Sequence, residues 1–218
     1  MDSIINTYRK DTARTTAAHL LNIKAIKLQP DAPFTWASGW KSPIYCDNRM
    51  ALSHPEVRNY LKHNMSEAAR MLYPDAEVIA GVATGAIAIG ALVADELGLP
   101  FVYVRPEAKS HGRKNQIEGY LPQGKRVLVI EDLVSTGKSS LLAVDALRKE
   151  DSQILGMLAI FTYEFDVATT NMTTAQCPLH TLSSYSYLVE EAVARNYVAN
   201  SELQTLSEWR KAPHSWGE

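Results

Sequence analysis

Two adjacent carboxylates, Glu131 and Asp132, stand between an apolar run and a turn of small residues in the segment VLVIEDLVSTGKSS, residues 127–140. The segment ends like a nucleotide-binding P-loop, G-x-x-x-x-G-K-[ST], but Asp132 occupies the position of the first glycine. The P-loop interpretation therefore fails. A buried strand, two acids, a tight turn and the start of a helix remain.

This arrangement still suits a phosphate. Backbone N–H groups at a helix N-terminus, together with hydroxyls of Ser135, Thr136 and Ser139, can surround a phosphate dianion. The two acids suit the vicinal hydroxyls of a ribose, or a Mg²⁺ ion that bridges hydroxyls and a pyrophosphate. A sugar phosphate satisfies both halves of the segment. The alternative is an ordinary strand-turn-helix unit in which the small residues only cap the helix and the acids are solvated.

A cationic segment, residues 105–118, is the second candidate for chemistry. Its basic residues are Arg105, Lys109, His111, Arg113 and Lys114, and its acids are Glu107 and Glu118. Cations that close over an anionic substrate stabilise the charge that grows on a leaving group, and a closing lid excludes water. The alternative is a solvated surface loop whose charges maintain solubility.

Two further segments have both a functional and a structural interpretation. GVATGAIA, residues 81–88, follows a strand and opens a helix, so its amides could hold a phosphate or its small residues could pack the helix on the sheet. In residues 34–49, Phe34, Trp36, Trp40 and Tyr45 lie close to Lys41 and Arg49. Such a set suits a lid over a flat, anionic heterocycle, or a hairpin whose aromatic side chains enter the core.

Composition places these segments in one ordinary globular domain. The chain has 218 residues, of which 46% are hydrophobic and 21% charged, and its net charge of −2 argues against a surface that attracts nucleic acid. Cys46 and Cys177 are too few for a disulfide framework and indicate a reducing compartment. No stretch has the run of about 18 apolar residues that a membrane span needs. We therefore expect a cytoplasmic protein that binds neither membrane nor nucleic acid.

Hydrophobic periodicity predicts the elements that must position these residues. We expect strands at 78–81, 101–104, 127–130, 154–161 and near 180–182, and helices at 11–26, 53–72, 86–97, 139–149, 188–197 and 202–209. Short apolar strands that alternate with amphipathic helices indicate an α/β fold with a mainly parallel central sheet and helices on both faces. Residues 106–125 interrupt this alternation without an apolar period, as functional lids do.

EDLVSTGKS resembles the phosphoribosyl pyrophosphate signature of the type I phosphoribosyltransferases, and the chain as a whole resembles the orotate branch of that family. Residues 34–49 are similar to its N-terminal hood, 79–94 to its pyrophosphate loop and 104–119 to its mobile catalytic loop, in the family's order. The resemblance implies a single domain, 1–218, with a hood formed by about 1–50 and the C-terminal tail. It also implies a homodimer in which the catalytic loop reaches the neighbour's site.

The resemblance implies transfer of a 5-phosphoribosyl group from phosphoribosyl pyrophosphate to orotate, giving orotidine 5′-monophosphate, with Mg²⁺ held mainly by the substrate and Asp132 as a candidate protein ligand. The implied catalytic residues are Arg105, Lys109, His111 and Asp132. The implied phosphoribosyl pyrophosphate ligands are Arg105, Lys109, His111, Glu131, Asp132, Leu133, Val134, Ser135, Thr136, Gly137, Lys138 and Ser139. The implied orotate ligand is Ser135, with Lys41 and Tyr163 as further candidates.

The chain also departs from the family pattern at positions where some members carry cations. Pro106 replaces a lysine of the catalytic loop, residues 83–85 lack the lysine of the pyrophosphate loop, and residues 37–39 lack that of the hood. An arginine is replaced near Tyr163. Two other functions therefore remain open: transfer to a purine, uracil or xanthine, and a regulator that senses phosphoribosyl pyrophosphate and binds nucleic acid.

Overall fold

The computed structural model describes residues 3–36, 39–106 and 116–217. Its centre is a seven-stranded sheet in the order β1-β11-β10-β9-β6-β7-β8. The strands are β1 (Ile5–Thr7), β6 (Val78–Val82), β7 (Phe101–Val104), β8 (Ile117–Glu118), β9 (Arg126–Val134), β10 (Gln153–Thr162) and β11 (Leu179–Ser184). Only the pairing of β8 with β7 is antiparallel. The predicted α/β fold with a mainly parallel sheet is confirmed.

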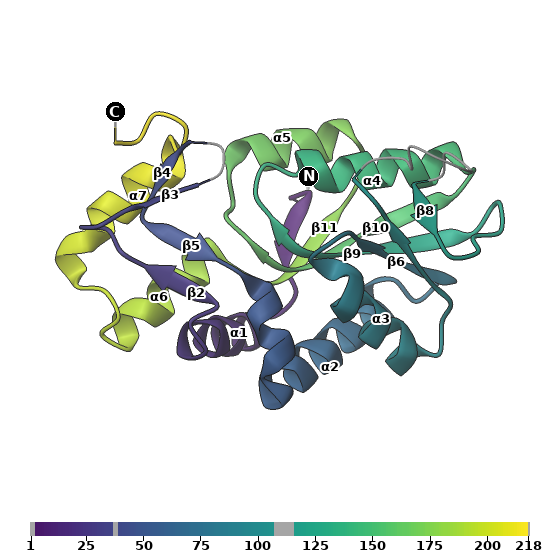
Figure 1. Cartoon of the computed structure of the whole chain (residues 1–218), viewed down its shortest axis with the longest axis horizontal. Coiled ribbons are helices and arrows are strands. Elements are labelled where there is room, and N and C mark those ends of the chain that lie inside the picture. The colour runs from purple at the N-terminus through teal and green to yellow at the C-terminus, as the bar shows by residue number, and fades with distance from the viewer. Residues whose placement is uncertain (1–2, 37–38, 107–115, 218) are drawn as a thin grey trace.

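Helices cover both faces of the sheet (Figure 1). The helices are α1 (Lys10–Asn22), α2 (Pro55–Leu72), α3 (Ala86–Leu97), α4 (Lys138–Lys149), α5 (Asp166–Thr174), α6 (Tyr185–Ala194) and α7 (Leu203–Lys211), with 3-10 turns η1 (Asn48–Ser53) and η2 (Asn200–Glu202). The α1, α2 and α3 side is packed by apolar residues such as Leu21, Leu61 and Val93. Val144, Leu147 and Met172 fill the core beneath α4 and α5 on the opposite face.

Two small antiparallel pairs lie at one end of the molecule, beside α6 and α7 (Figure 1). One pairs β2 (Ile26–Leu28) with β5 (Ile44–Cys46), and the other pairs β3 (Phe34–Thr35) with β4 (Lys41–Ser42). The β3–β4 hairpin contacts the C-terminal part of the chain through aromatic rings. The centroids of Trp36 and Trp209 are 5.7 Å apart, and those of Trp40 and His214 are 6.2 Å apart.

Several predicted boundaries were wrong. The first helix ends at Asn22 rather than at residue 26, because Lys24 adopts a positive φ of 58° and Ile26 begins β2. β9 does not end at Ile130. It continues to Val134, because its partner β10 pairs Ala159 with Glu131 and Thr162 with Val134, so both acids belong to the strand.

Three elements of the central sheet and its covering helices were not predicted. β1 and β8 are too short for a periodic signal, and α5 has the threonine-rich sequence DVATTNMTT, whose residues have low helix propensity. β2, which belongs to a separate pair, was not predicted either, and its first residue, Ile26, falls within the predicted first helix. Among the helices in the described part of the chain, none combines the length and apolar character that crossing a membrane requires.

Candidate active site

A cavity of about 450 Å³ opens at the carboxyl ends of β6, β7 and β9. β6 and β9 are neighbours in the sheet, but the chain leaves them in opposite directions: β6 leads through α3 to β7, and β9 leads through α4 to β10. Ligands of open α/β sheets bind at such a switch point, because the two connecting loops part and leave a crevice. The position of the cavity therefore follows from the topology.

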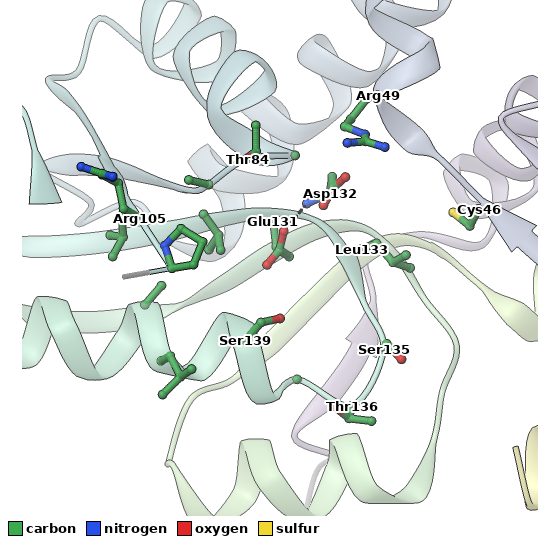
Figure 2. A pocket seen from close by; sticks show the side chains of 18 of the residues that line it. Cys46, Arg49, Thr84, Arg105, Glu131, Asp132, Leu133, Ser135, Thr136 and Ser139 are labelled. Atoms are coloured by element: carbon green, nitrogen blue, oxygen red, sulfur yellow. Dashed lines mark hydrogen bonds between the residues drawn. The ribbon is translucent and has the colours of Figure 1, made fainter. Parts of the chain in front are cut away.

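Glu131 and Asp132 lie side by side on this edge and point to opposite sides of β9, as successive residues of a strand do (Figure 2). Glu131 faces α4, where its carboxylate accepts hydrogen bonds from Ser140 Oγ at 2.7 Å and from the N–H of Asp132 at 2.9 Å. Asp132 faces the loop that follows β6. The pair therefore has one internally bonded acid and one acid at the cavity wall.

Burial distinguishes the two acids further. Glu131 is only 5% exposed, and this desolvation, followed by the charge of Asp132, raises the pKa of Glu131 well above its ordinary value. The neutral form of Glu131 is thereby favoured. Desolvation, followed by the charges of Asp132 and Asp47, also raises the pKa of the neighbouring Cys46 thiol, which stays protonated and is a poor nucleophile.

The turn between β9 and α4 forms the floor of the cavity with Ser135, Thr136, Gly137 and Ser139. Gly137 has a φ of 76°, a left-handed conformation that suits glycine, and precedes the first residue of α4. The first turn of a helix has N–H groups without intrahelical acceptors, and here they adjoin these hydroxyls. Asn171 holds the turn from outside by donating to the carbonyl of Thr136 at 2.9 Å. The turn is built to receive an anion.

The glycines in and near GVATGAIA bear on its packing interpretation. A methyl group on Gly81 would meet the carbonyl oxygen of Ala86 and then Phe101. One on Gly90, two residues beyond the segment in α3, would press on Phe101. These two glycines therefore serve close packing between α3 and the sheet. A methyl group on Gly85 would instead overlap the carboxylate of Asp132. The packing interpretation is therefore supported, Gly85 lets the backbone approach the acid at the cavity wall, and phosphate binding by the loop amides stays a prediction.

A second cavity of about 320 Å³ adjoins the first and shares Cys46, Leu133 and Ser135 with it. Its other walls are aromatic or small: Trp36 and Tyr45 from the hood segment, Tyr163 after β10, and Thr35. The Trp36 ring lies 5.4 Å from that of Tyr163, and its Nε1 donates to the carbonyl of Ile44 at 3.1 Å. This cavity suits a flat ring placed next to a bound sugar phosphate.

Most of the predicted site residues meet at these cavities. Arg105, Glu131, Asp132, Leu133, Ser135, Thr136, Gly137 and Ser139 line the larger one. Val134 is buried and Lys138 is exposed, and neither side chain lines a described cavity. Lys109 and His111 lie outside the described residues.

Of the three residues predicted to bind orotate, two line a described cavity and one does not. Ser135 lines both cavities, and Tyr163 lines the smaller one although it is only 2% exposed. Burial, followed by the proximity of Cys46, raises the pKa of Tyr163, so its hydroxyl remains neutral. Lys41 lines neither described cavity, but its Nζ donates to Thr35 Oγ1 at 2.9 Å, at the rim of the smaller one.

Sequence reasoning missed the contribution of the segment 46–49 to the larger cavity. Cys46, Asp47 and Arg49 line it, and the 3%-exposed side chain of Asn48 donates to the carbonyl of Asp132 at 2.7 Å. Nothing in the local sequence indicates that a residue 84 positions away would be bonded to the acid pair. The one local signal is the run of three polar residues, 47–49, directly after β5.

Comparison with known proteins agrees with this geometry. The chain matches the family described as phosphoribosyl transferase domain over residues 53–171. An orotate phosphoribosyltransferase of Cytophaga hutchinsonii is 53% identical over 203 residues, which are 93% of this chain and 97% of that protein. One of Porphyromonas gingivalis is 50% identical over 208 residues, 95% of this chain and 99% of that protein.

Solved structures show the same fold. An orotate phosphoribosyltransferase from Aeropyrum pernix superimposes with a TM-score of 0.73 at 25% identity, covering 84% of this chain and 99% of that one. A Mycobacterium tuberculosis orotate phosphoribosyltransferase in complex with phosphoribosyl pyrophosphate gives a TM-score of 0.64 at 24% identity, covering 80% of this chain and 98% of that one.

Proposed function

The chain belongs to the orotate phosphoribosyltransferase family, and we propose that it transfers the 5-phosphoribosyl group of phosphoribosyl pyrophosphate to N1 of orotate. The products are orotidine 5′-monophosphate and pyrophosphate, in the biosynthesis of UMP. One observation carries the proposal beyond family membership. The acid pair and the anion-binding turn line one cavity, and an aromatic cavity that suits a base opens directly beside it.

Each part of the site has its own role in the reaction, set by its position in the cavity. The turn at Ser135–Ser139 binds the 5′-phosphate, and Asp132, next to Glu131, orients the ribose hydroxyls. The bond between C1 of the ribose and the pyrophosphate oxygen breaks with its electron pair on that oxygen. N1 of orotate supplies the pair for the new bond, and the proton that N1 carried is released to solvent. Positioning and electrostatic stabilisation supply the catalysis, so that no protein nucleophile is needed.

The described residues fit a Mg²⁺ ion that arrives with the substrate. They contain no cluster of three or more His, Cys, Asp or Glu that could hold a metal alone. Mg²⁺ is commonly held by one or two carboxylates and the phosphates of a substrate, and Asp132 at the cavity wall is suited to be such a carboxylate. The ion, when bound, neutralises charge on the pyrophosphate.

The remaining parts of the proposal rest on the resemblance to the family. Residues 1–50 and the C-terminal tail form a hood over the base, which agrees with the contact between Trp36 and Trp209. Lys109 and His111 bind the pyrophosphate from the segment that follows Arg105. The protein acts as a homodimer, and the free thiols of Cys46 and Cys177 suit the reducing cytoplasm.

Loss of orotate in the presence of phosphoribosyl pyrophosphate tests the reaction, and we expect it only with Mg²⁺ present. Uracil, xanthine, adenine, guanine and hypoxanthine are offered in parallel, with pyrophosphate release as the common signal. Release with one of these bases and not with orotate would reassign the substrate. If the protein releases no pyrophosphate with any base, but slows the migration of nucleic acid in a gel when phosphoribosyl pyrophosphate is added, it is a regulator instead.

Mixing two inactive variants tests whether the cationic segment acts across a dimer interface. Lys109→Ala and Asp132→Asn are each expected to lose most activity while remaining folded. If each site combines Lys109 of one protomer with Asp132 of its partner, half of the randomly mixed dimers regain one intact site, and activity recovers to about one quarter. Inactive mixtures that nevertheless exchange subunits would place both residues in the site of the same protomer.

A further inference from the structure

The larger cavity carries little positive charge for the ligand proposed to occupy it. Its charged lining residues among the described part of the chain are Asp47, Arg49, Arg105, Glu131 and Asp132. Phosphoribosyl pyrophosphate has a phosphate and a pyrophosphate, and the loop between β6 and α3 contributes only Ala83, Thr84 and Gly85 to the wall. Each guanidinium that faces this cavity is therefore important for binding.

The two arginines reach the cavity from different elements. Arg105 directly follows β7, and its guanidinium lies 3.5 Å from the carboxylate of Glu118. Arg49 comes from η1, and Figure 2 shows it at the end of the cavity where Thr84 and Asp132 lie, away from Thr136. If the 5′-phosphate binds at the turn that contains Thr136, C1 of the ribose and the pyrophosphate attached to it point toward Arg49.

The backbone beneath Arg49 is fixed to the acid pair. Asn48, which is 3% exposed, donates from Nδ2 to the carbonyl of Asp132 at 2.7 Å and accepts from the Cys46 thiol at 3.3 Å. Asp47 caps η1 by accepting from the N–H of Arg49 at 3.2 Å. The base of the arginine side chain is therefore held at a constant distance from Asp132.

The guanidinium itself remains available. Its Nε and Nη2 donate to the two carboxylate oxygens of Asp47 at 2.7 and 3.0 Å, and Nη1 has no hydrogen-bond partner within the described ranges. The side chain of Arg49 is 57% exposed, and ion pairs exposed to this degree contribute little to stability. A pyrophosphate can therefore bind Nη1 while Asp47 keeps the guanidinium oriented, or can replace Asp47 altogether.

We propose that Arg49 binds the pyrophosphate group of the substrate and stabilises the charge that it gains as the bond to C1 breaks. The inference rests on the proposed function. Arg49 donates hydrogen bonds only, and no proton is transferred. Its guanidinium supplies, from the segment before α2, a positive charge that residues 83–85 of the pyrophosphate loop do not provide.

Steady-state kinetics in both directions test the role. In Arg49→Gln we expect the KM for phosphoribosyl pyrophosphate and, in the reverse reaction, the KM for pyrophosphate to rise about 10-fold or more, because a charge-assisted hydrogen bond is lost. The KM values for orotate and orotidine 5′-monophosphate should stay near those of the wild type. Arg49→Lys, which keeps the charge, should recover part of the loss.

Arg14→Gln is the matched control, because Arg14 forms an exposed ion pair with Glu190, 3.5 Å long, on α1. This variant should keep the wild-type KM values for phosphoribosyl pyrophosphate, pyrophosphate, orotate and orotidine 5′-monophosphate. The inference would be overturned if Arg49→Gln left the KM values for phosphoribosyl pyrophosphate and pyrophosphate unchanged, or if it raised the KM for orotate by the same factor. It would also be overturned if Arg49→Lys recovered none of the loss seen in Arg49→Gln. A wild-type protein without orotate-dependent pyrophosphate release would instead refute the proposed function.

Discussion

Glu131 and Asp132 are adjacent in sequence but differ in environment. Glu131 is 5% exposed and bonded to Ser140, and its raised pKa favours the neutral form, whereas Asp132 reaches the cavity wall beside Gly85. An amide in place of the neutral Glu131 changes the electrostatics little, whereas an amide in place of Asp132 removes a carboxylate oxygen that orients the ribose hydroxyls. The two residues should therefore respond differently to the same conservative substitution.

We expect Asp132→Asn to lower kcat/KM for phosphoribosyl pyrophosphate by about 100-fold or more, as the loss of a preorganised electrostatic contact does. Glu131→Gln should cause a much smaller loss, since the amide can retain the bond to Ser140. Steady-state kinetics at saturating orotate measure both. Equal losses in the two variants would show that Glu131 is ionised in the working enzyme and contacts the substrate directly.

At the scale of elements, the loop between β6 and α3 has to approach Asp132 closely, and Gly85 makes this possible. Gly85→Ala should displace either the loop or the carboxylate and strongly reduce turnover. Gly90→Ala is the matched substitution within α3, where the added methyl group would meet Phe101 at 2.9 Å. Overpacking of that kind costs about 1–3 kcal/mol of unfolding free energy.

Thermal unfolding and turnover of the two alanine variants separate the two roles. Gly90→Ala should lower Tm and keep the activity of its folded fraction, whereas Gly85→Ala should lose activity at a temperature where it is fully folded. If Gly85→Ala keeps normal turnover, the close approach to Asp132 has no catalytic importance.

η1 and β9 are joined by the side chain of Asn48, which donates to the carbonyl of Asp132. Asn48→Ala leaves that carbonyl without its donor and should lower the unfolding free energy by about 1–3 kcal/mol. It should also raise the KM for phosphoribosyl pyrophosphate, because Arg49 and Asp132 lose their fixed spacing. Urea unfolding and kinetics measure the two effects.

Asn64→Ala is the control, because Asn64 makes a bond of similar length, 2.9 Å, to the carbonyl of Tyr60 within α2, away from the cavity. It can lower stability but should leave the KM unchanged. A normal KM in Asn48→Ala would mean that the fixed spacing is not needed for binding.

These elements also show how far the sequence could predict the fold and the site. α3 and β7 were predicted at their observed bounds, because an amphipathic helix and a short apolar strand have clear periods. The acids and the turn after them were predicted from local chemistry. The bond from Asn48 to Asp132 and the contact of Gly85 with the same acid depend on which strands become neighbours, and local periodicity carries no such information.

For the whole molecule, two acids give stability opposite dependences on pH: Glu77, which precedes β6 and pairs with residues at the start of β9, and Glu131 within β9. Hydrogen bonds from Lys125 and Arg126 lower the pKa of Glu77 from 4.5 to about 2. The stability from this ion pair is complete above 4.5 and is lost as the pH falls toward 2. Glu131 acts in the other direction, since its raised folded pKa means that stability falls as the pH rises above 4.5.

Urea unfolding of the wild type, Glu77→Gln and Glu131→Gln between pH 2.5 and 8 tests these two contributions. Glu77→Gln should flatten the loss of stability below pH 4.5, because the glutamine cannot gain a proton. Glu131→Gln should remove the decline above pH 4.5 and be relatively more stable than the wild type at neutral pH. Parallel profiles for wild type and Glu131→Gln would mean that this buried acid has the same pKa in the folded and unfolded chain, and the assignment of a neutral Glu131 would have to be abandoned.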